Sequence, residues 1–228
     1  MAHLDRQGDV FVLVLGEGEN RFNPASVKAL GALLDEVEAS PPPRALVTTA
    51  VGKIWSNGLD LEWMSAHTAE INPLLVSVHE LLARVLAAGV PTVAALQGHA
   101  FAAGAMLALA HDERVMRADR GYFCLPEVDI KIPFSPGMSA LISARLSART
   151  AHEAMTTGRR YGGIEAEQAG IVKDAVPDSE VVSRAIELAG ALAAKDPATL
   201  STIKQRLYAN MLAALRDSDA NTLPLPPQ

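Results

Sequence analysis

The chain contains a single cysteine, Cys124, among its 228 residues, which excludes an internal disulfide and is typical of a reducing compartment. It has no uninterrupted run of eighteen apolar residues and no apolar signal core near its start, so neither a membrane span nor a secretory signal is predicted. Basic residues are few: 20 Lys and Arg stand against 26 Asp and Glu, and the net charge of −6 argues against nucleic acid as the main partner. The last residues carry no peroxisomal tripeptide. These absences predict a cytoplasmic protein that binds neither nucleic acid nor a membrane.

Several catalytic patterns are also missing. His79-Glu80 is not followed by a second histidine at metalloprotease spacing, and one cysteine cannot build a zinc knot, so no metal is expected. Ser56 with His111 and Asp112 lacks the nucleophile elbow of a serine hydrolase. Nothing matches a phosphate loop.

The pattern that is present alternates strands and helices in ordinary globular material, with 49% hydrophobic and 20% charged residues. Apolar runs predict strands over residues 10–15, 45–49, 92–96 and 114–118. Helical spacing predicts helices over residues 25–38, from the cap Asn72-Pro73 to Pro91, over 104–111 and over 198–215. This alternation predicts an α/β core with parallel strands followed by a helical C-terminal third, and the Pro-rich tail after Asp219 is predicted to be disordered.

A run of very small side chains follows the third predicted strand. Eight of the thirteen residues from Gly98 to Ala110 are glycine or alanine, and they lead into a helix. Such residues allow a ligand to approach the backbone closely, and the free N–H groups at a helix start favour negative charge. Tight packing of the helix against a strand, with no ligand, explains the run equally well.

Glu127 is the most informative single residue, because it lies among apolar neighbours in YFCLPEVDI. A carboxylate in an apolar pocket has a raised pKa and can act as a base near neutral pH. The alternative is a solvent-facing carboxylate on a half-buried strand. Upstream, Asn57-Gly58 marks a turn directly after a strand, where backbone N–H groups can point at a ligand.

Three motifs, in this order and spacing, resemble the crotonase (enoyl-CoA hydratase/isomerase) superfamily. They are SNGLDL at residues 56–61, GHAFAAGAMLALAHD at 98–112, and PEVDI at 126–130 followed by PFSPG. The resemblance runs from about Phe11 to Tyr208 and is greatest to the monofunctional 3,2-trans-enoyl-CoA isomerases of the plant type. It implies a spiral of ββα units over residues 1–190, and a C-terminal helical region over residues 191–228 that packs on neighbouring subunits in a homotrimer or a dimer of trimers.

The resemblance also implies a site. The backbone N–H groups of Leu59 and Ala103 would form an oxyanion hole for an acyl-CoA thioester, and Glu127 would be the catalytic acid–base group. Coenzyme A would be part of the substrate, and no separate cofactor is expected. The first of the two glutamates that the family's hydratases use would fall at Met106, which cannot activate water. One carboxylate suffices to move a double bond, so the resemblance implies an isomerase of fatty acid β-oxidation with weak or absent hydratase activity.

Further residues are expected to bind substrate. In the two N–H-bearing segments they are Ser56, Asn57, Gly58, Asp60 and Gly104. Near the mouth of the site, the cations expected for the CoA phosphates are Arg21, Lys53 and Lys204. Beside Glu127, the expected residue is Phe134. Each cation could equally be an ordinary surface charge. Two alternatives remain open, namely another crotonase-type reaction (hydratase, thioesterase or decarboxylase) with Asp60, Glu62 or Asp129 as a second polar group, and a silent acyl-CoA-binding oligomer.

Overall fold

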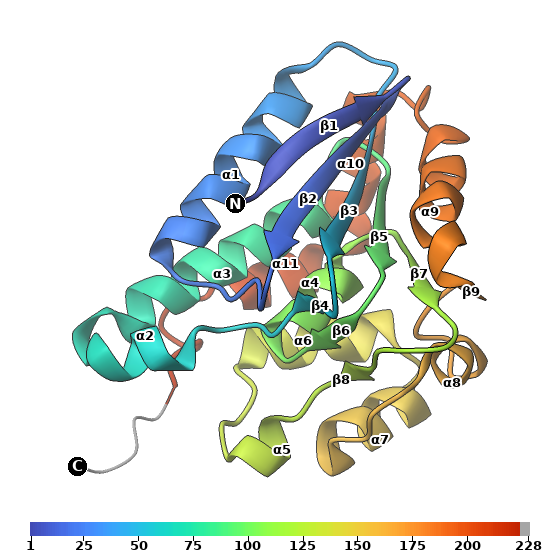
Figure 1. Cartoon of the computed structure of the whole chain (residues 1–228). Helices are drawn as coiled ribbons and strands as arrows, with labels where there is room; N and C mark the ends of the chain where they lie inside the picture. The colour runs from blue at the N-terminus through green and yellow to red at the C-terminus, as the bar shows by residue number, and fades with distance from the viewer. Residues whose placement is uncertain (224–228) are drawn as a thin grey trace.

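A computed structural model of the chain describes residues 1–223 and places a large sheet at the centre of the molecule (Figure 1). All neighbouring strands of this sheet are parallel except the first pair, which is antiparallel. In spatial order its six strands are β1 (His3–Gln7), β2 (Val10–Glu17), β3 (Ala45–Val51), β5 (Thr92–Leu96), β7 (Glu113–Arg117) and β9 (Asp174–Val176). The four apolar runs of the sequence form β2, β3, β5 and β7, so their prediction is confirmed.

A second, three-stranded parallel sheet positions the site. Its strands are β4 (Ile54–Ser56), β6 (His99–Phe101) and β8 (Phe123–Cys124). Each comes next in sequence after a strand of the large sheet, and each is followed by a helix. The predicted spiral of ββα units is therefore present. Because the three strands are parallel, the segments that follow their carboxyl ends meet at one edge.

Helices cover both faces of the large sheet, and Figure 1 shows α9 alone on one side of it. Val181, Ala185 and Ala189 of α9 pack there against buried strand residues, while the other face belongs to the larger core cluster. The helices are α1 (Pro24–Ala39), α2 (Leu61–Ala66), α3 (Ile71–Leu86), α4 (Ala103–Ala110), α5 (Glu127–Ile130), α6 (Pro136–Arg145), α7 (Ala148–Thr157), α8 (Gly163–Gln168), α9 (Val181–Gly190), α10 (Pro197–Leu207) and α11 (Ala209–Arg216), with 3₁₀ turns at Thr68–Glu70 and Asp178–Glu180.

Local signals account for α1. The Asn23 side chain accepts a hydrogen bond from the backbone N–H of Ser26 at 3.0 Å, and Pro24 occupies the first helical position. The apolar residues at helical spacing, Val27 to Val37, are buried. This prediction is confirmed.

Two helix predictions are wrong in detail. Asn72 does not cap α3, because the 3₁₀ turn before it leads directly into the helix and Glu70 takes the cap position. The helix predicted over residues 198–215 is two helices that meet at Tyr208, whose hydroxyl accepts a hydrogen bond from Arg145 at 2.6 Å. Ile203 and Leu207 of α10 are exposed, whereas Leu215 of α11 is buried. The boundary predicted after residue 190 falls at the end of α9, and that division into two parts stays a prediction.

The start of the Pro-rich tail is part of the folded body. Asn221 is only 2% exposed, and Leu223 packs against the main core. The prediction of disorder after Asp219 is therefore wrong for residues 220–223, and its remainder lies outside the described residues.

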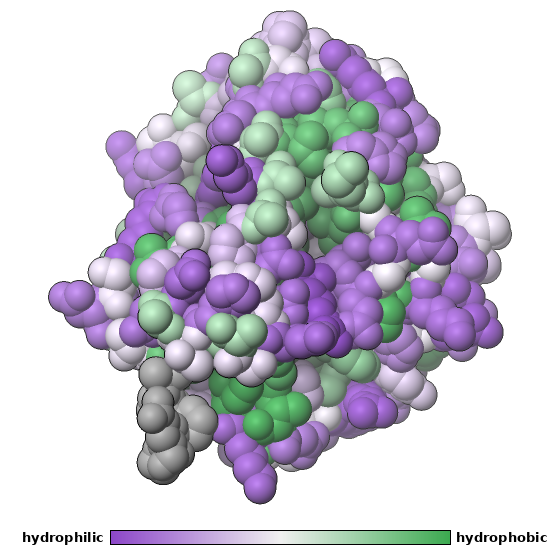
Figure 2. Space-filling model, turned by 60° about the vertical axis from the view of Figure 1, so that its left-hand side comes forward, coloured by the Kyte–Doolittle hydropathy of each residue, from purple (hydrophilic) through white to green (hydrophobic). Residues whose placement is uncertain are grey.

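The surface is largely hydrophilic, and on the face shown in Figure 2 hydrophobic side chains gather in an upper and a lower patch. Over residues 1–223, no helix is both long and apolar enough to cross a membrane.

Candidate active site

A small apolar cavity of about 180 Å³ lies where the carboxyl ends of β4, β6 and β8 meet α4, α5 and α6. It collects residues from segments far apart in the sequence. Its walls are Asn57, Leu59, Leu61, Phe101, Ala102, Ala103, Met106, Pro126, Glu127, Ile130, Ile132, Pro133, Met138 and Leu223. The structure thus brings together the three residues that the sequence analysis placed at the reaction centre, Leu59, Ala103 and Glu127.

Glu127 is buried, although not on a strand. The sheet ends at Cys124, and Glu127 begins the short helix α5, whose last two residues donate backbone hydrogen bonds to Pro126. A half-buried strand would bury Val128 and Ile130 and expose Glu127. The helical turn does the opposite, since Glu127 is 6% exposed while Val128 and Ile130 are 49% and 42% exposed. The alternative of a solvent-facing carboxylate on a strand is wrong.

Burial gives the Glu127 carboxyl the character of a base near neutral pH. Desolvation raises its pKa from 4.5 to about 7. Its Oε2 atom is buried and has no hydrogen-bond partner among the described residues. An unpartnered carboxylate oxygen in an apolar wall is free to accept a proton from a bound molecule.

The backbone N–H groups of Leu59 and Ala103 are free to donate to a ligand. The backbone groups on either side of Leu59 already have partners. The N–H of Asp60 donates to the carbonyl oxygen of Phe22, and the N–H of Phe22 donates to the carbonyl oxygen of Gly58. Ala103 is the first residue of α4, where an N–H has no partner within the helix. Neither N–H donates to another group in residues 1–223. Both lie in the wall of the cavity that also contains Glu127.

Two glycines bring the N–H-bearing segments together. A Cβ on Gly58 would lie 2.7 Å from the amide nitrogen of Ala103, and Gly58 has φ +77. A Cβ on Gly104 would lie 2.5 Å from the carbonyl oxygen of Ser56. The small residues therefore serve tight packing, and the role of the run toward a ligand stays a prediction.

The other acidic residues near these motifs lie elsewhere. Asp60 caps α2, where its side chain accepts from the Trp63 N–H and from Asn23. Glu62 and Asp129 are exposed. Within the described chain, Glu127 is the only carboxylate in the cavity wall, and the buried Met106 side chain lies in the same wall.

The predicted cations are not gathered at the cavity. Arg21 follows β2 beside the Leu59 segment and pairs with Glu19, with Asp60 at 3.9 Å and with Glu62 at 3.8 Å. Lys53 precedes β4 and lines a different cavity, of about 420 Å³, at the opposite end of the small sheet.

Lys204 is 5% exposed, and its Nζ donates to Asp112 at 2.7 Å and to the carbonyl oxygen of Val90 at 3.2 Å. This places it inside the chain's own fold. Phe134 lines a neighbouring cavity that shares Glu127 as a wall. The roles of these residues toward CoA stay predictions.

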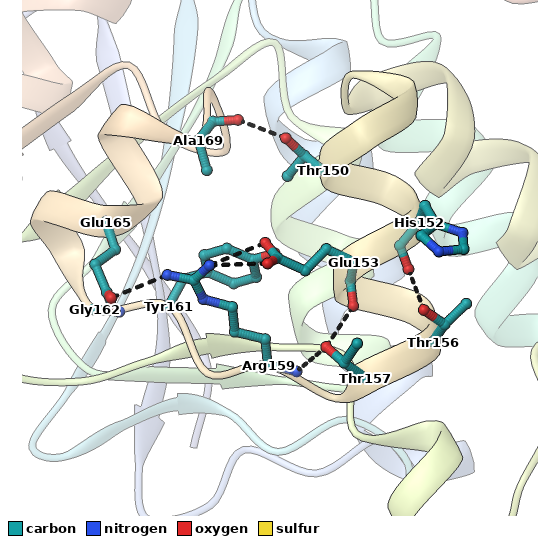
Figure 3. A network of polar contacts seen from close by, with 10 residues as sticks. All are labelled: Thr150, His152, Glu153, Thr156, Thr157, Arg159, Tyr161, Gly162, Glu165 and Ala169. Atoms are coloured by element: carbon teal, nitrogen blue, oxygen red, sulfur yellow. Dashed lines mark hydrogen bonds and ion pairs between the residues drawn. The ribbon is translucent and has the colours of Figure 1, made fainter.

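A polar network supports the strand from which α5 emerges (Figure 3). Arg159 pairs with Glu153 and Glu165, and Glu153 accepts a hydrogen bond from the Tyr161 hydroxyl at 2.7 Å. Tyr161 in turn exchanges two backbone hydrogen bonds with Phe123 of β8, each 2.9 Å long. The network thereby ties α7 and α8 to the strand that ends three residues before Glu127. Sequence patterns did not predict this network, and the glycine breaks at residues 158 and 162–163 were the available signal.

Comparison with known proteins decides the family. A sequence profile described as enoyl-CoA hydratase/isomerase matches residues 7–222. The chain belongs to the enoyl-CoA hydratase/isomerase family. Within this family it is 38% identical over 234 residues to enoyl-CoA delta isomerase 3 of Arabidopsis thaliana, with 98% of each chain covered. It is also 38% identical to the protein named enoyl-CoA delta isomerase 2, peroxisomal, of that plant, over 94% of this chain and 95% of the relative.

Solved structures place this enoyl-CoA hydratase/isomerase family member in the crotonase fold. A Mycobacterium tuberculosis structure titled probable enoyl-CoA hydratase superposes with a TM-score of 0.88 at 28% identity, covering 95% of this chain and 92% of that one. Another from that organism, titled as the apo structure of an enoyl-CoA isomerase, gives a TM-score of 0.87 at 28% identity and covers 95% of both chains. The predicted superfamily and fold class are confirmed.

Proposed function

We propose that the chain is an acyl-CoA isomerase that converts a 3-enoyl-CoA into a trans-2-enoyl-CoA with Glu127 as its one acid–base group. The observation that carries the proposal is the lone buried carboxylate, with a pKa of about 7 and an unpartnered oxygen, in one cavity wall with two free backbone N–H groups. The names of the two Arabidopsis relatives, both enoyl-CoA delta isomerases, support it.

The reaction needs one proton moved between two carbons. The ionised Glu127 removes a proton from C2, and the electrons of that C–H bond form the C1–C2 double bond of a dienolate, whose negative oxygen accepts hydrogen bonds from the N–H groups of Leu59 and Ala103. The protonated Glu127 then returns the proton to C4, where the C3–C4 π electrons form the new C–H bond. The C1–C2 π electrons move to C2–C3, and a lone pair of the enolate oxygen restores the carbonyl. Two preorganised donors of this kind contribute about 3–4 kcal/mol each in other enzymes.

Hydration is disfavoured by the same cavity. Addition of water needs a second group to activate it, and Met106 stands where the resemblance places the hydratases' first glutamate. Asp60, Glu62 and Asp129, the candidates for a second polar group in another crotonase-type reaction, are absent from the described wall.

Substrate binding is assigned to the segments around the cavity. Asn57, Gly58 and Gly104 shape the oxyanion hole, and Arg21, which lies beside the Leu59 segment, meets the CoA phosphates. Assembly into trimers, a cytoplasmic location and a role in β-oxidation complete the proposal. Because one relative is named peroxisomal, the cytoplasmic location of this chain is to be tested by direct measurement.

The test compares two substrates and three proteins. Isomerisation of trans-3-hexenoyl-CoA and hydration of trans-2-hexenoyl-CoA are measured for the wild type, Glu127→Gln and the control Asp129→Asn. Asp129 is an exposed carboxylate two residues from Glu127 and outside the cavity wall, so it matches the change in charge. We expect isomerisation without comparable hydration, lost in Glu127→Gln and kept in Asp129→Asn. Substantial turnover by Glu127→Gln would overturn the proposal.

A further inference from the structure

Asn221 joins the C-terminal segment to two helices. Its side chain is nearly fully buried, accepts a hydrogen bond from the Gly137 N–H at 2.8 Å, and donates to the carbonyl oxygens of Ala214 at 2.7 Å and Leu215 at 3.1 Å. Gly137 lies in the first turn of α6, while Ala214 and Leu215 lie in the last turn of α11. Both polar atoms of the Asn221 amide group therefore have hydrogen-bond partners, and these bonds fix the direction of the chain after α11.

The Asn221 side chain has little room to move. A Cβ on Gly137 would lie 2.8 Å from the Leu215 Cα and 3.1 Å from the Asn221 Nδ2 atom. The start of α6, the end of α11 and Asn221 are thus in close contact at one point. Met138, the next residue of α6, lines the cavity that contains Glu127. The hydrogen-bonded position of Asn221 therefore lies immediately beside the cavity wall.

Leu223, two residues beyond Asn221, is part of that wall. It is half-buried, packs against the main core and shares the cavity with Glu127, Leu59 and Ala103. The cavity measures about 180 Å³. An apolar protein cavity of about 150 Å³ holds benzene, a molecule of six carbons. The space beside the proposed base therefore suits an acyl group of about six carbons, with Leu223 as one boundary.

From this arrangement we propose that Leu223, held by Asn221, limits the substrate to short acyl chains. The inference rests on the proposed acyl-CoA function and specifies its substrate class. Leu223 is a specificity-determining residue, because its side chain occupies volume that a longer acyl chain would need. Asn221 is a positioning residue, because it touches no cavity space and acts through the place that it gives to Leu223.

The test measures binding, which does not depend on turnover. Dissociation constants of hexanoyl-CoA and decanoyl-CoA are determined by calorimetry for the wild type, Leu223→Ala and Leu207→Ala. Leu207 offers a matched control, since it undergoes the same substitution and is 66% exposed outside the cavity wall. A difference of one methylene in an apolar pocket changes discrimination about 10–200-fold. We expect the wild type to prefer hexanoyl-CoA, and Leu223→Ala to shift the ratio toward decanoyl-CoA by about tenfold or more, while Leu207→Ala leaves it in place.

Two further variants sharpen the result. Leu223→Trp should weaken hexanoyl-CoA binding relative to butanoyl-CoA, because it removes cavity volume. Asn221→Ala should reproduce the ratio shift of Leu223→Ala. An unchanged ratio in Leu223→Ala would overturn the inference. Lower thermal stability of Asn221→Ala without a shift in the ratio would overturn the positioning role of Asn221.

The two proposals fail in different ways. If the ratio shifts but the wild type does not isomerise 3-hexenoyl-CoA, the isomerase function is wrong and the limit on chain length stands. If the wild type isomerises both chain lengths equally and the ratio does not move, the limit on chain length is wrong and the function stands. Absence of acyl-CoA binding would overturn both.

Discussion

Gly58 lies against Ala103 so closely that a Cβ on Gly58 would be 2.7 Å from the Ala103 amide nitrogen. This nitrogen carries one of the two N–H groups proposed to hold the thioester oxygen. The contact joins the segment after β4 to the start of α4, which are 45 residues apart in the sequence. The spacing of the two donors therefore depends on a position that has no side chain.

Gly58→Ala is predicted to lower kcat for isomerisation about 10²–10³-fold, the usual effect of losing one oxyanion-hole donor. The new methyl group would push the Ala103 segment away or rotate its N–H. Gly52→Ala is the matched control: its φ of +84 gives a similar backbone strain, of about 1–2 kcal/mol, but nothing lies within 4 Å of the new Cβ. Steady-state kinetics and thermal melts of both variants make the comparison. Equal activity in the two variants would contradict the role of the contact.

The pH dependence of kcat/KM should follow the Glu127 carboxyl. Because burial raises its pKa to about 7 and the base must be ionised, activity on trans-3-hexenoyl-CoA is predicted to rise with pH and to be half-maximal near pH 7. A pH–rate profile of the free enzyme's kcat/KM measures this directly. A midpoint near 4.5, the ordinary value for glutamate, would show that the acting carboxylate is not buried.

The same burial predicts that Glu127 lowers stability at high pH. Its folded-state pKa lies above its unfolded value, so the stability present below about pH 4.5 falls as pH rises through about 7. Glu127→Gln should therefore be more stable than the wild type at pH 8.5, by up to about 3 kcal/mol, and similar to it at pH 4. Urea unfolding at the two pH values tests this, with Asp129→Asn as the exposed control. An equal difference at both pH values would argue against ionisation as the cause.

Lys204→Met is predicted to destabilise the fold by about 3 kcal/mol, because it leaves Asp112 without its ion-pair partner in a mostly buried site. Lys195→Met, at an exposed lysine of the same C-terminal region, is the control and should change stability by less than about 0.5 kcal/mol. Denaturant unfolding and hexanoyl-CoA binding are measured together. Lower stability with unaltered affinity would place Lys204 in the fold alone, whereas lower affinity would support the predicted contact with CoA.

Much of the core was predictable because its signals are local. Capping by Asn23, the helical spacing of Val27 to Val37 and the continuous apolar strands act over a few residues, so periodicity identifies them. The failures occur where distant contacts override the local pattern. The long helical stripe is interrupted at Tyr208, whose hydroxyl accepts a hydrogen bond from Arg145, 63 residues away. Asn221 is held in the folded body because α6 and α11 supply its hydrogen-bond partners.

The sequence by itself determined the four apolar strands β2, β3, β5 and β7 and the first helix. It also predicted Leu59, Ala103 and Glu127 as the central residues, through motifs whose order and spacing resemble a known family. Only the tertiary structure decided that Glu127 is buried, that Lys204 is paired internally and that Leu223 lines the cavity. Burial, and with it the pKa of an acid, depends on what surrounds a side chain, and here the surroundings come from segments that meet only when the small sheet, α4, α5, α6 and the C-terminal segment have packed together.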